Sequence, residues 1–327
     1  MKYETKYKIT CFGGGNAMPK VVLEPLKKCS FLKIVSVTSM LDSGGSTREI
    51  CEEFSALPPG DIKKHLLALS FAPSWKKRLF SLRFGKWKFP GGHVGHSFAN
   101  IFIAGLEKIT GSYKKTLKIL HDFMEVKGEV LPAIIKKADL WAELEDGKLI
   151  KGEDEIDVPK KHDGNLKIKK IFIKPKVSAY PPVLQAIKKA DLIIIGPGDL
   201  YSSILCCFLA KGIKSAFLKT KAKKLFLCPA MTKFGETQGF SVKDFADEVE
   251  KYIGTSLDWV LYNNFFPEKA RVETYRKKHP ELLELVRVDK GLPKEKFIGK
   301  NLLLKKGPVE YDPLKVKKVI LSFLKKL

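Results

Sequence analysis

The feature that most constrains this chain is a glycine-rich turn directly after its first apolar stretch. Tyr7–Phe12 is a short apolar run typical of a buried strand, and residues 13–16 (Gly-Gly-Gly-Asn) follow it at once. Pro19 favours the start of a helix shortly afterwards. A second apolar run, Leu32–Thr38, is rich in the β-branched residues that favour strands. A strand, a helix and a second strand in this order predict a right-handed βαβ unit with parallel strands.

Four more turns of this kind follow apolar runs later in the chain. They are residues 42–46, 196–199, 231–237 and 263–264. Open parallel sheets bind ligands beyond the carboxyl ends of their strands, where glycine lets backbone N–H groups approach an anion closely. One glycine loop alone is equally well explained as a tight turn, so the interpretation rests on several of them. We expect an α/β fold with a Rossmann-like, mostly parallel, doubly wound sheet and a site for a phosphorylated, nucleotide-like ligand.

The periodicity of the sequence changes between residues 126 and 175. Residues 142–150 alternate apolar and polar side chains around an Asp-Gly pair, which is typical of a β-hairpin. We interpret residues 126–175 as a small inserted β-containing subdomain within a single Rossmann-like domain that covers residues 1–327. Helices are predicted over residues 19–28, 61–70, 97–110, 112–123, 201–211, 241–253 and 314–325.

The formal net charge of +24 raises the question of a nucleic acid partner. Only six of the sixty basic residues are arginine, the side chain best suited to bidentate contacts with phosphate and guanine. Lysine pairs such as Lys63-Lys64 are spread along the chain, as on solvated helix faces. A nucleic-acid-binding module is therefore the least favoured of three hypotheses.

Other features of the composition bear on the compartment. The sequence has no apolar run of roughly 18 or more residues, and its polar N-terminal residues do not resemble a signal peptide. None of the six cysteines lies in a C-x-x-C pair, which argues against a zinc site and against a disulfide framework. We expect a cytoplasmic protein without a membrane span, and the sequence leaves a homo-oligomer open.

The first glycine turn departs from the standard phosphate-binding motifs. A G-x-G-x-x-G fingerprint would need glycine where Met18 stands, and a P-loop would need glycine before Lys20. The sequence therefore argues against dinucleotide dehydrogenases and P-loop enzymes.

Three polar residues near the turns are candidates for a role in binding or in local structure. Asp42 follows the second strand, where an acid could bind a ribose, a metal ion or only its own loop backbone. Asp61 suits the N-cap of a helix. His96 could contact a phosphate at a helix start or serve the structure alone.

Taken together, these segments resemble the superfamily that contains the bacterial gluconeogenesis factors and the 2-phospho-L-lactate transferases. The matching segments are residues 13–16 (GGGN), 42–46 (DSGGS), 58–62 (PPGDI), 95–100 (GHSFAN), 196–204 (GPGDLYSSI) and 231–237 (MTKFGET). The chain is more similar to the gluconeogenesis factors. The resemblance implies a Rossmann-like core with an inserted subdomain.

The resemblance also implies a function. A gluconeogenesis factor would be a cytoplasmic regulator, without a required cofactor, that binds a nucleotide-sugar such as UDP-N-acetylglucosamine. It would link carbon metabolism to cell wall precursor supply and cell shape. The alternative is a transferase that moves a phospholactyl group from a guanylyl donor to a deazaflavin in coenzyme F420 biosynthesis, with Mg²⁺ held by Asp42. The residues implied in ligand binding are Gly13, Gly14, Gly15, Asn16, Gly44, Gly45, Ser46, His96, Asn100, Gly196, Pro197, Gly198, Asp199, Ser202, Ser203, Thr232 and Asn263.

Three departures from the family pattern bear on the ligand. Ser43 follows Asp42 where the family usually has paired acids, which weakens the metal-dependent interpretation because one carboxylate is lost. Residues 16–19 replace the more usual Thr-Gly beginning. Asp199 replaces a commonly small hydroxyl residue and adds negative charge beside the expected phosphate.

Overall fold

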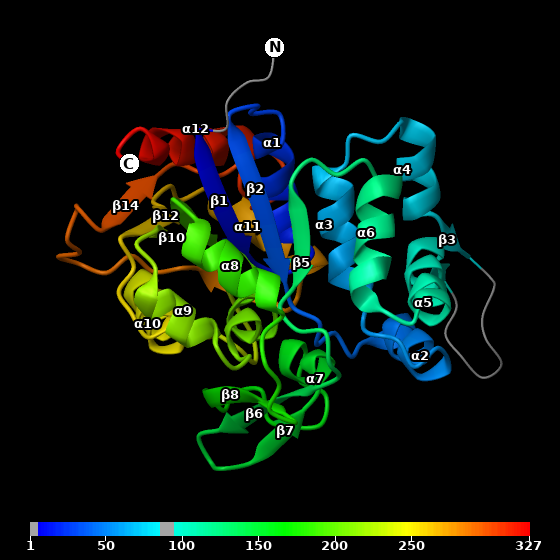
Figure 1. Cartoon of the computed structure of the whole chain (residues 1–327). Coiled ribbons are helices and arrows are strands. Elements are labelled where there is room, and N and C mark those ends of the chain that lie inside the picture. Colours follow the sequence, from blue (N-terminus) through cyan, green and yellow to red (C-terminus); the bar gives the residue numbers. More distant parts are fainter. Residues whose placement is uncertain (1–5, 86–94) are drawn as a thin grey trace.

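A seven-stranded parallel sheet forms the centre of the fold (Figure 1). The computed structural model describes residues 6–85 and 95–327. Neighbouring strands of the sheet are parallel throughout, so the expected Rossmann-like α/β fold is confirmed. From edge to edge the strands are β14 (Phe297–Lys300), β12 (Trp259–Asn263), β10 (Lys223–Leu227), β9 (Leu192–Ile195), β1 (Tyr7–Phe12), β2 (Leu32–Thr38) and β5 (Glu129–Pro132).

The two strands on either side of the switch in strand order are deeply buried. Every residue of β9 is buried, as are the last four residues of β1. Strands that are covered on both faces consist of continuous apolar runs, because neither face meets water. Figure 1 shows α8 (Pro181–Lys189) in front of the sheet and α1 (Glu24–Leu26) behind it.

The order of the strands reverses between β1 and β9. From β1 the chain moves through β2 to the edge strand β5, then returns to β9 and continues through β10, β12 and β14. Ile9 to Phe12 pair with Leu192 to Ile195, so the two strands end level with each other. Doubly wound sheets bind their ligands where the strand order reverses. The glycine loops after β1 and β9 therefore lie side by side at the position where a ligand is expected.

Helices and short turns of helix connect the strands. The remaining α-helices are α2 (Gly45–Glu53), α3 (Gly60–Leu69), α4 (Ser74–Ser81), α5 (Phe98–Thr110), α6 (Tyr113–Phe123), α7 (Glu153–Asp157), α9 (Ile213–Lys219), α10 (Val242–Ile253), α11 (Lys269–Lys278) and α12 (Pro313–Leu324). The π-helices are η1 (Pro19–Leu23) and η2 (Leu200–Ile204), and η3 (Leu205–Phe208) is a 3-10 helix. Among the helices that the structure describes, none is both long enough and apolar enough to cross a membrane.

Two helical segments differ from the prediction. The segment predicted as one helix over residues 201–211 consists of η2 and η3. The glycine turn predicted over residues 42–46 is shorter, because α2 begins at Gly45. Gly45 and Ser46 therefore belong to the first turn of a helix, where backbone N–H groups are left without intrahelical partners.

A small antiparallel sheet lies beyond the carboxyl ends of the central strands, at the bottom of Figure 1. It consists of β6 (Asp139–Leu144), β7 (Leu149–Lys151) and β8 (Ile168–Lys174). Residues 129–132, which were assigned to the inserted subdomain, instead form β5 of the main sheet, because they pair in parallel with β2. We refer to residues 139–174, including α7, as the insert.

Two shorter strand pairs complete the fold. β3 (Arg83–Phe84) pairs with β4 (His96–Ser97), and β11 (Met231–Lys233) pairs with β13 (Leu282–Leu285). Both pairs are antiparallel. Figure 1 shows β3 in a group of helices, α2 to α6, that lies beside the edge strand β5.

Candidate functional site

The loop after β1 packs so closely against its neighbours that larger side chains would not fit. A Cβ atom on Gly14 would lie 2.6 Å from Ser203 Oγ, and one on Gly15 would lie 2.3 Å from Asp61 Oδ1. A Cβ atom on Gly198 would lie 4.0 Å from the Gly14 nitrogen. The fold therefore brings together predicted residues from the loops after β1 and β9, and only glycine permits this approach.

His65 of α3 anchors the first loop. Its Nε2 atom lies 3.0 Å from the Gly14 carbonyl oxygen, and its Nδ1 atom lies 2.7 Å from Ser36 Oγ of β2. Burial lowers the pKa of His65 to about 4, although its bond to Gly14 opposes this effect. The ring is therefore neutral near neutral pH: Nε2–H donates to the carbonyl and Nδ1 accepts from the serine hydroxyl.

We expect His65→Gln to weaken the fold in a pH-dependent way. A buried base with a lowered pKa contributes stability above its unfolded pKa, near 6.5, and loses it as the pH falls towards about 4. The difference in free energy of unfolding between the wild type and His65→Gln should therefore decrease as the pH falls through this window, by at most about 3 kcal/mol. Urea denaturation of both proteins at several pH values measures the difference. A difference that does not change with pH would contradict the neutral assignment.

Asp61 faces the same loop from the first turn of α3. The N-cap of this helix is Pro59, so the prediction that Asp61 caps it is wrong. The carboxylate instead accepts a hydrogen bond from the Gly15 N–H, and burial raises the pKa of Asp61 to about 6 against the opposing charge of Lys64. Lys64 Nζ donates to Asn16 Oδ1 at 2.7 Å. Helix α3 thus supplies an acid and a cation directly beside the glycine loop.

The insert adds a third carboxylate to Asp42 and Asp61. Asp42 follows β2, and its Oδ2 atom lies 2.8 Å from where a Cβ on Gly60 would stand, next to Asp61. Glu153 is the first residue of α7. Burial raises the pKa of Glu153 to about 10, and the negative charges of Asp42, Asp157 and Asp61 act in the same direction. We call Asp42, Asp61 and Glu153 the acidic trio.

Sequence reasoning missed Glu153 because the segment that contains it was interpreted only as part of an inserted β-containing subdomain. Ser43 was expected to cost the site a carboxylate. The structure shows that Ser43 Oγ donates to Asp154 Oδ1 at 2.6 Å, and that Arg48 Nη2 bonds Asp154 Oδ2 at 2.9 Å. These contacts dock α7 on the loop after β2, so the insert supplies a carboxylate where the loop lacks one. The run of acids at 153–155 was the available signal.

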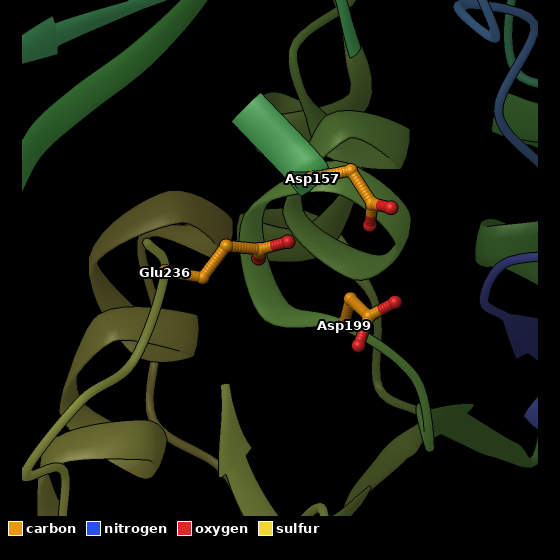
Figure 2. Close-up of side chains that lie close together, drawn as sticks. All are labelled: Asp157, Asp199 and Glu236. Atoms are coloured by element: carbon orange, nitrogen blue, oxygen red, sulfur yellow. The ribbon is translucent and has the colours of Figure 1, made fainter. Parts of the chain in front are cut away.

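A second group of carboxylates surrounds Lys233. Figure 2 shows Asp157, Asp199 and Glu236 close together, from α7, the loop after β9 and the turn after β11. Lys233 Nζ forms ion pairs with Asp157, with Asp199 Oδ2 at 3.1 Å and with Glu236 Oε1 at 3.6 Å. Burial would lower the pKa of Lys233, but Glu236, Asp199 and Asp157 outweigh it and hold the pKa well above its usual range. We call these four residues the Lys233 cluster.

The Lys233 cluster also holds η2 in place. Glu236 Oε2 accepts from the Tyr201 N–H at 2.7 Å, and Glu236 Oε1 accepts from Ser202 Oγ at 2.7 Å. Burial raises the pKa of Glu236 to about 7, while Lys233 lowers it. A carboxylate of the protein thus occupies the start of η2, where an anion is favoured. Asp199 is offset by Lys233, so its negative charge is not exposed alone to a ligand.

Two cavities lie near the glycine loops: residues of the loops after β1 and β9 line one of them, and the loop after β2 and the insert line the other. The smaller one, of about 310 Å³, lies on the β10 side, and the larger one, of about 830 Å³, lies between the loop after β2 and the insert. Residues lining the smaller cavity include Asn16, Lys20, Val21, Pro197, Gly198, Asp199, Met231, Tyr275, Val309 and Tyr311. Residues lining the larger cavity include Leu41, Asp42, Ser43, Arg48, Lys137, Ile150, Lys151, Asp154 and His162.

The side chains of several other predicted residues contact the protein itself, so their binding roles stay predictions. Asn263 Nδ2 donates to the Phe265 carbonyl at 2.7 Å, and Thr232 Oγ1 accepts from the Glu284 N–H at 3.3 Å. Both side chains therefore serve local structure. His96 and Asn100 are buried among α2 to α6, and His96 Nε2 lies 3.3 Å from Glu49 Oε2.

The family described as 2-phospho-L-lactate transferase CofD matches residues 9–302. This range includes both glycine loops, the insert and the Lys233 cluster. It ends beyond β14, the edge strand of the main sheet. The match therefore covers nearly the whole fold.

Individual relatives agree with this match. A gluconeogenesis factor from Listeria innocua is 36% identical over 84% of this chain and 85% of its own length. A gluconeogenesis factor from Bacillus subtilis is 32% identical over 98% of this chain and 99% of its own length. A crystal structure of a UPF0052 family protein from Bacillus halodurans has a TM-score of 0.85 at 30% identity and covers 97% of this chain and 99% of its own.

Proposed function

Since the chain belongs to the 2-phospho-L-lactate transferase CofD family, we propose that it binds a nucleotide-sugar of the UDP-N-acetylglucosamine kind and acts as a regulator. Its relatives are named gluconeogenesis factors, so we assign the role to carbon metabolism, with effects on cell wall precursor supply and cell shape. The observation that carries the proposal is the meeting of two glycine loops where the strand order reverses.

The two cavities suggest how the ligand lies. Tyr275, Tyr311 and Val21 give the smaller cavity an apolar wall that suits a base and ribose. The diphosphate would lie over Gly14 and Gly15, with Lys64 beside it. The larger cavity is lined by charged side chains such as Asp42, Arg48 and Lys137 among apolar ones, and it would receive the sugar, whose hydroxyl groups need hydrogen-bond partners.

We also propose that a divalent cation binds beside the diphosphate. The acidic trio offers carboxylate oxygens, the ligands that Mg²⁺ prefers, and Mg²⁺ is usually held by one or two carboxylates together with phosphates. Glu153 forms no ion pair with a cation among the residues that the structure describes. Mg²⁺ bound by the acidic trio would neutralise charge on both the carboxylates and the diphosphate. Lys233 already serves the second carboxylate group, so we propose no metal there.

The second candidate function is phospholactyl transfer from a guanylyl donor to a deazaflavin. The acidic trio favours it, because Mg²⁺ beside the diphosphate would stabilise the charge that develops on the leaving group. The larger cavity would then hold the acceptor. Incubation with donor, acceptor and Mg²⁺, followed by mass spectrometry, tests this function. Formation of the phospholactyl product would displace the regulatory proposal.

Thermal unfolding in the presence of nucleotides tests the regulatory proposal. A ligand at about 100 times its Kd stabilises the native state by about 2.7 kcal/mol. UDP-N-acetylglucosamine with Mg²⁺ should raise the Tm clearly, and the ligand should be recovered unchanged. UDP alone should have a smaller effect. If neither uridine nor guanosine diphosphate compounds shift the Tm, the proposal fails.

A further inference from the structure

Helix α4 presents an apolar face that nothing in the described structure covers. Trp75 and Leu79 lie one turn apart on α4, Leu82 is the C-cap of this helix, and Phe71 lies shortly before its start. Trp75 is 59% exposed, Phe71 is 46% exposed and Leu82 is 45% exposed. We call these four residues the α4 face.

The α4 face is not the side by which the helix joins the fold. Phe80 is fully buried, and its ring lies 6.3 Å from the rings of both Phe102 and Phe123. Phe80 thus anchors α4 to α5 and α6, while Trp75 and Leu82 point elsewhere. A short helix with one anchored face and a second exposed apolar face has surface left for a partner.

Positive charge surrounds the α4 face. The sequence between Asp61 and Glu107 contains no acidic residue, although the whole chain has 36. The part of this stretch that contains α4 carries four basic residues, Lys76, Lys77, Arg78 and Arg83. A partner for this face should therefore be anionic.

Neighbouring elements add to this charge. Lys27 Nζ and Lys127 Nζ each lie 5.8 Å from the centre of the Phe71 ring. Burial lowers the pKa of Lys27, and the charge of Glu24 opposes this effect. The positive charges of Lys77 and Lys28 lower the pKa further, so lysines from separate segments converge here. Glu125 is the acid that faces this group most directly, and it pairs with Lys76 at 2.9 Å.

We propose that the α4 face docks on a membrane that carries anionic phospholipids. Aromatic and leucine side chains would enter the headgroup region, while the surrounding lysines and arginines bind the lipid phosphates, as in interfacial helices. Nucleic acid suits this surface less well, because Leu79 and Leu82, two of its four side chains, are aliphatic and do not stack on bases as aromatic rings do. Figure 1 shows α4 at the opposite end of the molecule from the insert, so docking would leave the glycine loops accessible.

Vesicle sedimentation tests the proposal with the full chain. Vesicles of phosphatidylcholine mixed with phosphatidylglycerol should bind the protein at low salt, and vesicles of phosphatidylcholine alone should bind it weakly. The double variant Phe71→Ser/Trp75→Ser should reduce binding about tenfold or more, because each side chain contributes apolar burial. The double variant Lys77→Glu/Arg78→Glu should also reduce it, by removing and reversing charge.

Phe266→Ser is the matched control, because Phe266 is 62% exposed on a different surface and should not affect binding. The Trp75→Phe variant should still bind anionic vesicles. The blue shift of tryptophan fluorescence that vesicles cause should be smaller in this variant than in the wild type. Three results would each overturn the proposal: a wild type that does not sediment with anionic vesicles, a serine double variant that binds equally well, and binding to duplex DNA that excludes the vesicles.

Discussion

Replacing Lys233 with methionine is expected to lower the free energy of unfolding by about 3–5 kcal/mol near neutral pH. The substitution leaves the carboxylates of Asp157, Asp199 and Glu236 without the cation that they surround. Glu236 is 3% exposed and cannot recover this loss by hydration. Removing one partner from a buried ion pair costs more than the pair itself contributes, because the remaining charge stays desolvated.

The effect of Lys233→Met should depend on pH in a defined direction. Burial raises the pKa of Glu236 to about 7 even with the lysine present. A carboxyl group with a raised pKa stabilises the fold below its unfolded pKa and loses this contribution as the pH rises through the folded value. Without the lysine the pKa of Glu236 should rise further, so repulsion among the carboxylates should be strongest at alkaline pH and should weaken as protons bind at lower pH. The deficit against the wild type should therefore be smaller in acid.

Urea denaturation across this pH range measures the deficit. Lys243→Met is the matched control, because the ion pair of Lys243 with Asp247 is exposed on both sides and should contribute less than about 1 kcal/mol. The double variant Lys233→Met/Glu236→Gln should regain part of the lost stability. Equal losses for Lys233→Met and Lys243→Met would show that the Lys233 cluster does not hold the site together.

Replacing Glu153 with glutamine is expected to change stability and binding in opposite directions. In the presence of a chelator, the variant should be more stable than the wild type by on the order of 1–2 kcal/mol, because it removes one of several crowded carboxylates. The same change removes a proposed ligand of Mg²⁺. Mg²⁺-dependent affinity for the nucleotide-sugar should therefore fall by about tenfold or more.

Thermal unfolding with and without Mg²⁺, and titration with nucleotide-sugar, measure both effects of Glu153→Gln. Asp154→Asn is the control for the helix, because Asp154 docks α7 through Ser43 and Arg48 but is not a member of the acidic trio. It should destabilise α7 without raising stability in chelator. If the Glu153→Gln variant is less stable than the wild type and binds Mg²⁺ with unchanged affinity, Glu153 is not part of the site.

The sequence was informative about the sheet because fully apolar strands have a strong local signal. The apolar runs of β1 and β9 are followed directly by their glycine turns, so the loops were predictable, whereas the strand order that makes them neighbours came from the structure. β5 was missed as a strand of the main sheet, because it has only two apolar aliphatic residues between Glu129 and Pro132 and is followed closely by the antiparallel strands of the insert.

The chemistry of the site was harder to predict because its charged residues come from distant segments. Glu153 joins Asp42 only when α7 docks on the loop after β2, through contacts between residues 43 and 154. Lys233 had no signal of its own, because a lysine in a chain with many lysines is usually solvated. Asp61 had the signature of an N-cap, yet α3 starts earlier and turns its carboxylate toward Gly15.

Calorimetric titration of the wild type with UDP-N-acetylglucosamine in Mg²⁺ tests whether the glycine loops form a nucleotide-sugar site. The Gly14→Val variant is the control. Valine at this position would meet Ser203 at once, because even its Cβ atom lies 2.6 Å from the serine oxygen. We predict saturable binding at one site per chain, weakened by removal of Mg²⁺, lost in Gly14→Val, and without conversion of the ligand. No heat of binding in the wild type, or equal binding by Gly14→Val, would contradict a nucleotide-sugar site at the glycine loops.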